Sequence, residues 1–585
     1  MKTIVTLLSE KVSEAFEACG YPVEFGVISA SDRPDLCQFQ CNGAFSAAKA
    51  LKKPPRAIAS QIADVLQKDD AFRDVAVAGA GFINISVKDE FLLGYVSALL
   101  NDPYLGIPQT EEPETILLDY GGPNVAKPLH IGHLRSAVIG EALKRIVKAT
   151  GRTAIGDVHL GDWGLQIGLV IAELWERNPG WACFSDDFDP EADVVPPMTA
   201  EELNEIYPFA SKKSKEDETF KQKAKRITAL LQKGNPGYLA LWREIIAASV
   251  ADMKKNYKNL NVSFDYWYGE SDAEAYVPKL LDILKSKGLL HESNGAMVVD
   301  VSEERDASPI PPVIIKKTDD SNIYATTDLA TIIQRAEDFH PQQMWYIVDS
   351  RQSLHFTQVF RCAEKAGLTG GAALEHLGFG TMNGTDGKPY KTREGGVMPL
   401  AGLYDTVFQA ALDRVSASDF GAGQDKAETA RKIATATVKF GDLINHRLKD
   451  YVFDLDKFLA AEGKTGSFLL YTIARINSIL SKVDAAPAAP VLRGGVDSES
   501  ERDLLLRLAL SNEAFITAFA ERAPNFVCEN AYQLASVFSK FYHNNHILSE
   551  ENPEKKQLWL SLCLATKAVL QKHLDVLGIE AVEFM

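Results

Sequence analysis

One stretch of thirteen residues, Pro123 to Arg135, limits what this chain can fold into more than any other. It reads PNVAKPLHIGHLR and follows Thr115–Tyr120, a short run rich in branched and aromatic side chains that is typical of a buried parallel strand. After it, apolar residues recur at helical spacing from Leu134 to Ile146, and Gly151 ends the pattern. The stretch therefore predicts a strand, a crossing rich in Gly, Pro and His, and then a helix. Doubly wound sheets bind their ligands at such a crossing.

The side chains of this crossing suit a nucleotide. Gly132 has no Cβ, so a flat ring could lie directly on the backbone. His130 and His133 flank it and can donate hydrogen bonds to anionic oxygens, while Lys127 adds a positive charge. The plainer alternative is a helix start that carries histidines and binds nothing. For a chain of this composition, an HxGH pattern arises by chance only about once in a hundred chains, which favours the nucleotide site.

The same residues resemble a known family. His130-Ile131-Gly132-His133 matches the HIGH signature of class I aminoacyl-tRNA synthetases and related nucleotidyltransferases, and PNVAKPLHIGHLRS resembles its arginyl-tRNA synthetase form. The resemblance covers nearly the whole chain. It implies an α/β fold, a Rossmann-type parallel sheet with a helical insertion, between an N-terminal α+β domain and a C-terminal α-helical bundle.

Three segments are expected along the chain. Residues 1–108 include AGAGFINISV and KKPPRAIASQIA, which resemble the tRNA-contacting N-terminal domain of the family. Residues 109–450 form the catalytic segment, with a polar helical insertion at about 170–262. Residues 451–585 carry Leu, Ile and Phe at three- and four-residue spacing, which predicts a helical bundle and resembles the family's anticodon-binding domain.

Within the catalytic segment, further strands are expected beyond the first. TAIGDVHLGDWG, Thr153–Gly164, predicts a second strand that ends in a Gly-rich turn, where the glycines could serve close backbone packing alone. After the insertion, sheet elements are expected in AMVVDV, PPVIIKKTD, MWYIVDS and EHLGFGTM. In the first segment, VAVAGAGFINISV is strand-like and Ala47–Lys68 is expected to be helical.

Acceptors for a guanidinium group can be found in three stretches. A buried site binds this planar cation with carboxylates, because charge-assisted bidentate hydrogen bonds are strong. Glu270 lies in FDYWYGES, and Tyr324 and Asp328 are spaced i,i+4 so that one helical face presents both. Gln352 and His355 come just after a strand. Any one of these alone could equally be a helix cap or a surface residue.

Taken together, these stretches resemble the arginine pocket of the family. The resemblance implies that Glu270, Tyr324 and Asp328 surround the guanidinium. It implies that the α-amino and carboxylate ends of the amino acid are held by three further residues, which are Asp119, Asn124 and Gln352.

The second class I signature, KMSKS, is altered in this chain. The corresponding loop, Gly380–Gly396, has PYKTR in its place, and Thr392 stands where the second lysine would be. The loop is still Gly-rich and basic through Lys388, Lys391 and Arg393, so it could clamp phosphates, although a polar hairpin is the alternative. Arginyl enzymes without KMSKS carry a lysine just before HIGH, and Lys127 fits that position. Our hypothesis is that Lys127 replaces the missing charge.

Composition limits the class of protein further. Hydrophobic content is 46%, no apolar run is long enough to span a membrane, and the amino end becomes charged too early for a signal peptide. The 7 cysteines lack zinc-ribbon spacing, so we expect reduced thiols, no structural metal and a cytoplasmic location. A net charge of -17 argues against nucleic acid as a partner, but local basic runs such as Ser211–Arg226 leave tRNA possible.

The resulting hypothesis is an arginine–tRNA ligase that makes arginyl-adenylate from arginine and ATP and transfers the arginyl group to the terminal ribose of tRNA(Arg). Mg²⁺ would accompany ATP, no covalent enzyme nucleophile is needed, and nothing requires more than a monomer. Two alternatives stay open. One is a nucleotidyltransferase that adenylates a small acid without tRNA, against which the flanking domains argue. The other is a catalytically silent paralogue that binds RNA, against which the intact HIGH and pocket residues argue.

Overall fold

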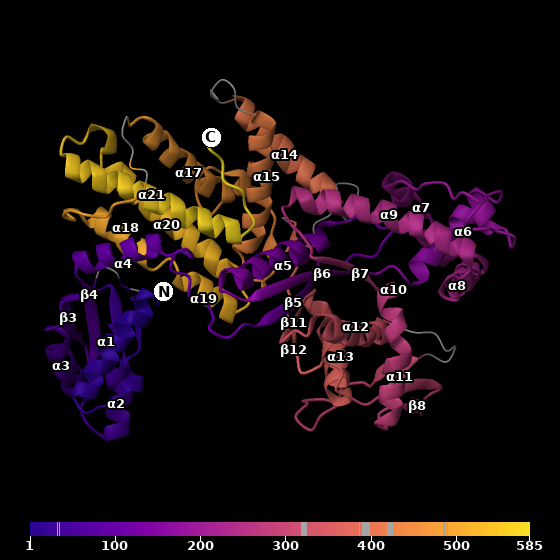
Figure 1. Cartoon of the computed structure of the whole chain (residues 1–585), viewed down its shortest axis with the longest axis horizontal. Helices are drawn as coiled ribbons and strands as arrows, with labels where there is room; N and C mark the ends of the chain where they lie inside the picture. Colours follow the sequence, from indigo (N-terminus) through magenta and orange to yellow (C-terminus); the bar gives the residue numbers. More distant parts are fainter. Residues whose placement is uncertain are drawn as a thin grey trace. The chain divides into compact units, whose positions relative to one another are not determined.

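A computed structural model of the chain describes residues 1–31, 33, 36–316, 324–384, 386–388, 398–417, 425–483, 487 and 489–585. The chain forms two compact units (Figure 1). Unit 1 contains residues 1–111, 149–151 and 460–585, and unit 2 contains residues 112–148 and 152–459. Among the described residues, every helix is too short or too polar to cross a lipid bilayer.

The core of unit 2 is a five-stranded parallel sheet in the order β12-β11-β5-β6-β7 (Figure 1). Its strands are β5 (Thr115–Tyr120), β6 (Thr153–Leu160), β7 (Tyr266–Gly269), β11 (Gln343–Ile347) and β12 (Ala373–His376). The predicted strand before the crossing is confirmed as β5, in which five of six residues are buried. The chain order reverses at β5, which pairs with β6 on one side and β11 on the other, so a crevice is expected at its carboxyl end.

Helices follow and cover these strands. The helix predicted after the crossing is confirmed as α5 (Ile131–Ala149), and four α-helices separate β6 from β7, as a helical insertion requires. The remaining helices of unit 2 are α6 (Leu165–Arg177), α7 (Ala200–Glu216), α8 (Glu218–Gln232), α9 (Pro236–Asn259), α10 (Glu270–Ala273), α11 (Val277–Ser286), α12 (Tyr324–Phe339), α13 (Ser353–Ala366), α14 (Leu400–Ala417), α15 (Lys426–Leu443) and α16 (Leu455–Leu459).

Some expected sheet elements lie outside the parallel sheet. AMVVDV and PPVIIKKTD contain β9 (Ala296–Val299) and β10 (Val313–Lys316), which pair antiparallel with each other, and β9 also pairs with β8 (His291–Ser293). The alternating burial of β10 explains the difference, since a strand with one open face suits an antiparallel hairpin. EHLGFGTM supplies the end of β12 and then β13 (Met382–Asn383), which pairs with β14 (Tyr451–Val452).

Unit 1 combines an α+β segment and a helical bundle. The first has an antiparallel sheet in the order β1-β2-β4-β3. Its elements are α1 (Ile4–Ala18), β1 (Ile28–Ala30), β2 (Phe39–Cys41), α2 (Gly43–Leu51), α3 (Pro55–Leu66), β3 (Phe72–Ala78), β4 (Phe82–Val87) and α4 (Asp89–Asn101). The expected helix over Ala47–Lys68 is two helices, because the chain turns at Lys52 with φ 54° and Pro55 begins α3.

The bundle confirms the helical prediction for the carboxyl-terminal segment. It consists of α17 (Gly466–Ser481), α18 (Glu499–Ala509), α19 (Glu513–Ala520), α20 (Asn525–Asn544) and α21 (Pro553–Val576). Two polar contacts join it to the α+β segment. Arg502 forms a bidentate ion pair with Asp89, with both N–O distances 2.7 Å, and the buried Asn512 amide donates to Tyr95 Oη and to the Gly106 carbonyl.

Candidate active site

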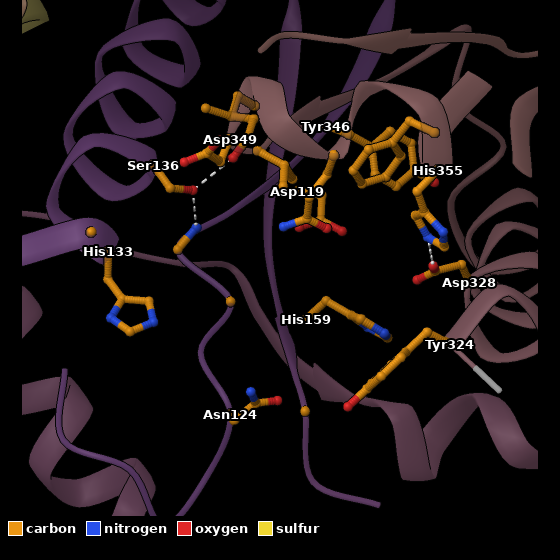
Figure 2. A pocket seen from close by; sticks show the side chains of 18 of the residues that line it. Asp119, Asn124, His133, Ser136, His159, Tyr324, Asp328, Tyr346, Asp349 and His355 are labelled. Atoms are coloured by element: carbon orange, nitrogen blue, oxygen red, sulfur yellow. Dashed lines mark hydrogen bonds and ion pairs between the residues drawn. The ribbon is translucent and has the colours of Figure 1, made fainter. Parts of the chain in front are cut away.

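A pocket with a volume of 440 Å³ lies at the carboxyl ends of the strands of unit 2 (Figure 2). The structure brings together in its wall most of the residues that the sequence singled out. These are the HIGH residues His130, Gly132 and His133 and the six predicted arginine-binding residues Asp119, Asn124, Glu270, Tyr324, Asp328 and Gln352. The HIGH turn and the acidic residues therefore face one cavity rather than two.

The two histidines of the HIGH turn are held by backbone hydrogen bonds. The His130 amide donates to Nδ1 of His133, and the Gly132 amide donates to Nδ1 of His130, both at 3.0 Å. Burial lowers the pKa of His133 to about 3, and burial together with Lys127 lowers that of His130. Both rings are therefore neutral at pH 7, with the proton on Nε2, because Nδ1 accepts. Each can donate one hydrogen bond to an anionic oxygen.

The structure gives Gly132 and Lys127, the other two candidate residues near the HIGH turn, neighbours that the sequence did not predict. The ring that lies closest to Gly132 is the imidazole of His130, since a Cβ on Gly132 would be 2.8 Å from its Cε1. Lys127 is not in the wall of the pocket. Its ammonium group lies 4.7 Å from the centre of the Tyr207 ring on α7, a cation–π contact that fixes its direction.

The altered KMSKS loop is described only in part. Lys388 is exposed, and the carbonyl of Lys388 accepts a hydrogen bond from the Gly384 amide at 2.8 Å, which closes a turn before it. Lys388 does not line the pocket. Lys391 and Arg393 lie outside the described residues, so their predicted contacts with phosphates stay predictions.

The acidic end of the pocket lies between α10 and α12. Burial, together with the nearby carboxylates of Asp162 and Asp328, raises the pKa of Glu270 to about 8. Asp328 Oδ2 lies 2.6 Å from Nε2 of His355, and this hydrogen bond raises the pKa of the imidazole (Figure 2). Tyr324 is 60% exposed at the rim, one helical turn before Asp328. Three oxygen-bearing side chains thus surround a space that suits a cation.

Asp119 belongs to a buried charge network at the floor of the pocket. Its Oδ2 lies 2.8 Å from Nη2 of Arg335, and the same nitrogen lies 2.6 Å from Oδ2 of Asp157. Burial alone would lower the pKa of Arg335, but the two carboxylates raise it above its ordinary value. One guanidinium between two carboxylates leaves a net negative charge, so this floor suits the ammonium group of an amino acid.

Asn124 is held against the second strand by a glycine. The Val125 amide donates to the Gly161 carbonyl at 3.0 Å, and the Gly161 amide donates to the Pro123 carbonyl at 3.1 Å. A Cβ on Gly161 would lie 2.0 Å from Oδ1 of Asn124. Close backbone packing, the plainer interpretation of the HLGDWG glycines, is thus what Gly161 provides, and it also sets the place of a pocket residue.

His159 and Arg335 were missed from the sequence. Figure 2 shows His159 pointing into the pocket between Asp119 and Tyr324, and both of its ring nitrogens are buried with no hydrogen-bond partner among the described residues. A signal was present, because Asp157 and His159 are two apart at the end of a predicted strand and so share one face. Arg335 gave no comparable signal, since an arginine in a helical pattern normally faces solvent.

The fold and the pocket define the catalytic domain of a class I aminoacyl-tRNA synthetase. A family model described as "tRNA synthetases class I (R), catalytic domain" matches residues 95–455. Models described as "Arginyl tRNA synthetase N terminal domain" and "DALR anticodon binding domain" match residues 2–87 and 469–585. The chain belongs to the arginyl-tRNA synthetase family.

Individual relatives agree over their full lengths. The chain is 48% identical over 587 residues to an arginine–tRNA ligase of Alkaliphilus oremlandii and 46% identical over 602 residues to one of Agathobacter rectalis, with 100% of each chain covered. Its fold is similar to the crystal structure of the Plasmodium falciparum arginyl-tRNA synthetase, with a TM-score of 0.81 at 22% identity and 100% of both chains covered.

Proposed function

We propose that this chain is an arginine–tRNA ligase used in translation, and that the pocket of unit 2 performs both steps of the reaction. In the first step, a carboxylate oxygen of arginine attacks the α-phosphorus of ATP, which forms arginyl-adenylate and releases pyrophosphate. In the second, a hydroxyl of the terminal ribose of tRNA(Arg) attacks the carbonyl carbon and AMP leaves. One observation carries this proposal: the HIGH turn and the acid-rich end line the same cavity.

The histidines act on the phosphates as neutral donors. Nε2–H groups of His130 and His133 stabilise the negative charge that builds up on the phosphate oxygens as the bond to pyrophosphate breaks. Because the two Nδ1 atoms are already held by the backbone, the rings need little reorganisation when ATP binds. Class I chemistry of this kind depends on positioning and charge neutralisation, and no covalent intermediate with the protein is needed.

Arginine is held at both ends. Asp328, Glu270 and Tyr324 bind the guanidinium, whose planar fork matches carboxylate oxygens. Asp119, Asn124 and Gln352 bind the α-amino and carboxylate groups near the crossing. Glu270 is protonated at neutral pH in the empty pocket and loses its proton when the guanidinium arrives, so that arginine binding releases a proton.

Positive charge for the ATP phosphates comes from Lys127 and from the loop residues Lys388, Lys391 and Arg393. Mg²⁺ enters with ATP, since phosphate oxygens and water are its preferred ligands. The described residues contain no group of three His, Cys, Asp or Glu side chains that could hold a metal ion by themselves.

The outer segments bind the tRNA. Residues 1–108 contact the body of the molecule, residues 109–450 catalyse, and residues 451–585 bind the anticodon. The enzyme works as a monomer in the cytoplasm. All seven cysteines are free thiols, and six of them are buried.

One assay tests this function against its alternatives. ATP–pyrophosphate exchange is measured with each amino acid, with and without tRNA(Arg), for the wild-type chain and for His133→Ala. Exchange with arginine, dependent on tRNA and reduced by about a hundredfold or more in His133→Ala, is the expected result. Exchange with another small acid in the absence of tRNA would indicate the nucleotidyltransferase, and no exchange at all would indicate the silent paralogue.

A further inference from the structure

Arg135, one helical turn after the HIGH histidines on α5, is a buried cation that the proposed chemistry does not use. It is 1% exposed, and its guanidinium is hydrogen-bonded to three separate groups. Nε donates to Oδ2 of Asp442 on α15 at 3.0 Å, and Nη1 donates to the carbonyls of Gly380 at 2.7 Å and Lys449 at 3.0 Å. Arg135 therefore joins the ATP-binding helix to two segments more than 240 residues away in sequence.

The segments that Arg135 contacts form a defined structure, which we call the stem and which consists of residues 378–383 and 447–453. The Gly380 amide donates to the Arg447 carbonyl at 2.9 Å, and the Thr381 amide donates to Oδ1 of Asp450 at 2.6 Å. Strands β13 and β14 continue this pairing. The stem leads directly into the loop that carries Lys388.

The stem also reaches the pocket. Phe379 lines the pocket, and its carbonyl accepts a hydrogen bond from the Ser350 amide at 3.0 Å. The guanidinium of Arg135 lies 5.8 Å from the centre of the Phe379 ring and 5.1 Å from that of Tyr451. Any shift of Arg135 would thus move the wall beside the HIGH turn.

A second contact holds the other side of the HIGH turn. The Leu400 amide donates to the Leu129 carbonyl at 2.9 Å, and the Ile131 amide donates to the Met398 carbonyl at 3.1 Å. His130 and Pro399 form an antiparallel bridge between these bonds. The chain before Lys388 and the chain at the start of α14 are therefore both fastened to residues 129–135.

We propose that Arg135 is a positioning residue for ATP, which holds the HIGH histidines and the stem at a fixed separation so that both face the same nucleotide. Three acceptors in different directions need a planar fork with several N–H groups, and a lysine ammonium group cannot reach all of them. This inference rests on the proposed binding of ATP by His130 and His133. We expect the effect of Arg135 to fall on ATP binding. The residues that hold the α-amino end of arginine are supported separately, by Arg335 beneath Asp119.

The test uses Arg135→Lys, with Lys144→Met as the matched control. Lys144 is a buried cation on the same helix, 3% exposed, and pairs with Glu141 without touching the stem. Steady-state aminoacylation gives the KM for ATP and the KM for arginine of each variant, and thermal unfolding gives the shift in Tm that each ligand causes. We expect Arg135→Lys to raise the KM for ATP by about fivefold or more, with the KM for arginine within about twofold. Lys144→Met should change neither.

Loss of folding would not leave the question open. If Arg135→Lys is unfolded, Arg135→Met/Asp442→Leu replaces the buried pair by apolar groups, an exchange that buried ion pairs often tolerate. In this variant a reduced Tm shift with ATP and an intact shift with arginine support the proposal. An unchanged KM for ATP, or an equal rise in both KM values, overturns it. If the proposed function itself is wrong, the result is different: the wild-type chain will not charge tRNA with arginine.

Discussion

His355 and Asp328 are joined by a hydrogen bond of 2.6 Å across the acidic end of the pocket. The bond connects α13 to α12 and occupies Oδ2 of the carboxylate, which leaves Oδ1 for a ligand (Figure 2). Because the hydrogen bond already fixes the carboxylate, binding a guanidinium costs less side-chain conformational entropy. The relationship makes Asp328 the strongest candidate for the residue that selects arginine.

Replacing Asp328 should therefore weaken arginine binding. Asp328→Ala is expected to raise the KM for arginine by about tenfold or more in steady-state aminoacylation, because a charge-assisted pair is lost in a partly buried site. The KM for ATP should stay near the wild-type value. Asp338→Ala is the matched control, since Asp338 is an exposed carboxylate on the same helix and does not line the pocket. An unchanged KM for arginine in Asp328→Ala would refute the assignment.

The raised pKa of Glu270 predicts a pH dependence for arginine binding. With a pKa of about 8, the carboxyl is mostly protonated at pH 7, and the carboxylate that a guanidinium needs becomes dominant as the pH rises to 9. The fraction ionised rises from about one tenth to about nine tenths, so the KM for arginine should fall by roughly fivefold to tenfold. Glu270→Gln should have a high KM without this slope.

The KM for ATP provides the internal control for that experiment. His130 and His133 have lowered pKa values and stay neutral from pH 7 to 9, so the hydrogen bonds proposed between these rings and phosphate should not change over this range. If the KM of the wild-type chain for arginine does not change between pH 7 and pH 9, Glu270 is not the titrating group in the pocket.

Lys127 is expected to contribute to adenylate formation. Lys127→Ala should lower kcat in ATP–pyrophosphate exchange by about tenfold or more, because it removes the positive charge that is proposed to act on the phosphates and the altered loop has one lysine fewer. Lys254→Ala is the control, since its ammonium group also lies on an aromatic ring, that of Trp267, at 5.1 Å. A near-normal kcat in Lys127→Ala would contradict the hypothesis that Lys127 replaces the charge missing from the altered KMSKS loop.

Gly161 offers a test of the pocket geometry without any change of charge. Because a Cβ at this position would lie 2.0 Å from Oδ1 of Asn124, Gly161→Ala must displace that side chain. We expect the KM for arginine to rise by about tenfold while Tm changes little. Gly180→Ala, where a Cβ would have no neighbour within 4 Å, should behave as wild type. Equal KM values in the two variants would show that the position of Asn124 does not matter.

Local patterns in the sequence predicted much of this architecture. Strand β5, the crossing and helix α5 follow from hydrophobic periodicity and from Gly and Pro, which act over a few residues. The break between α2 and α3 was missed, although Pro54 and Pro55 mark it. The candidate residues from β5, α10, α12 and the start of α13 all line one pocket, and it was the resemblance to the family's arginine pocket, not a local pattern, that grouped them.

Register and long-range packing could not be predicted in the same way. Asp119, Asp157 and Tyr346 lie side by side because β5 pairs with β6 and β11 in a particular register, which no local pattern fixes. Arg335 and Arg135 look like surface residues in a helical pattern, and their burial depends on partners far away in sequence. The supporting network beneath a site is thus the part that only the folded chain reveals.

The ion pair between Asp89 and Arg502 has a consequence for biosynthesis. The α+β segment leaves the ribosome first, but the helices that complete its unit are among the last to be made. Until then, the side of α4 that carries Tyr95 has no cover from α18 and no hydrogen bond from Asn512. A nascent or truncated chain would therefore present this side to chaperones and to other unfinished chains, and aggregation would begin there.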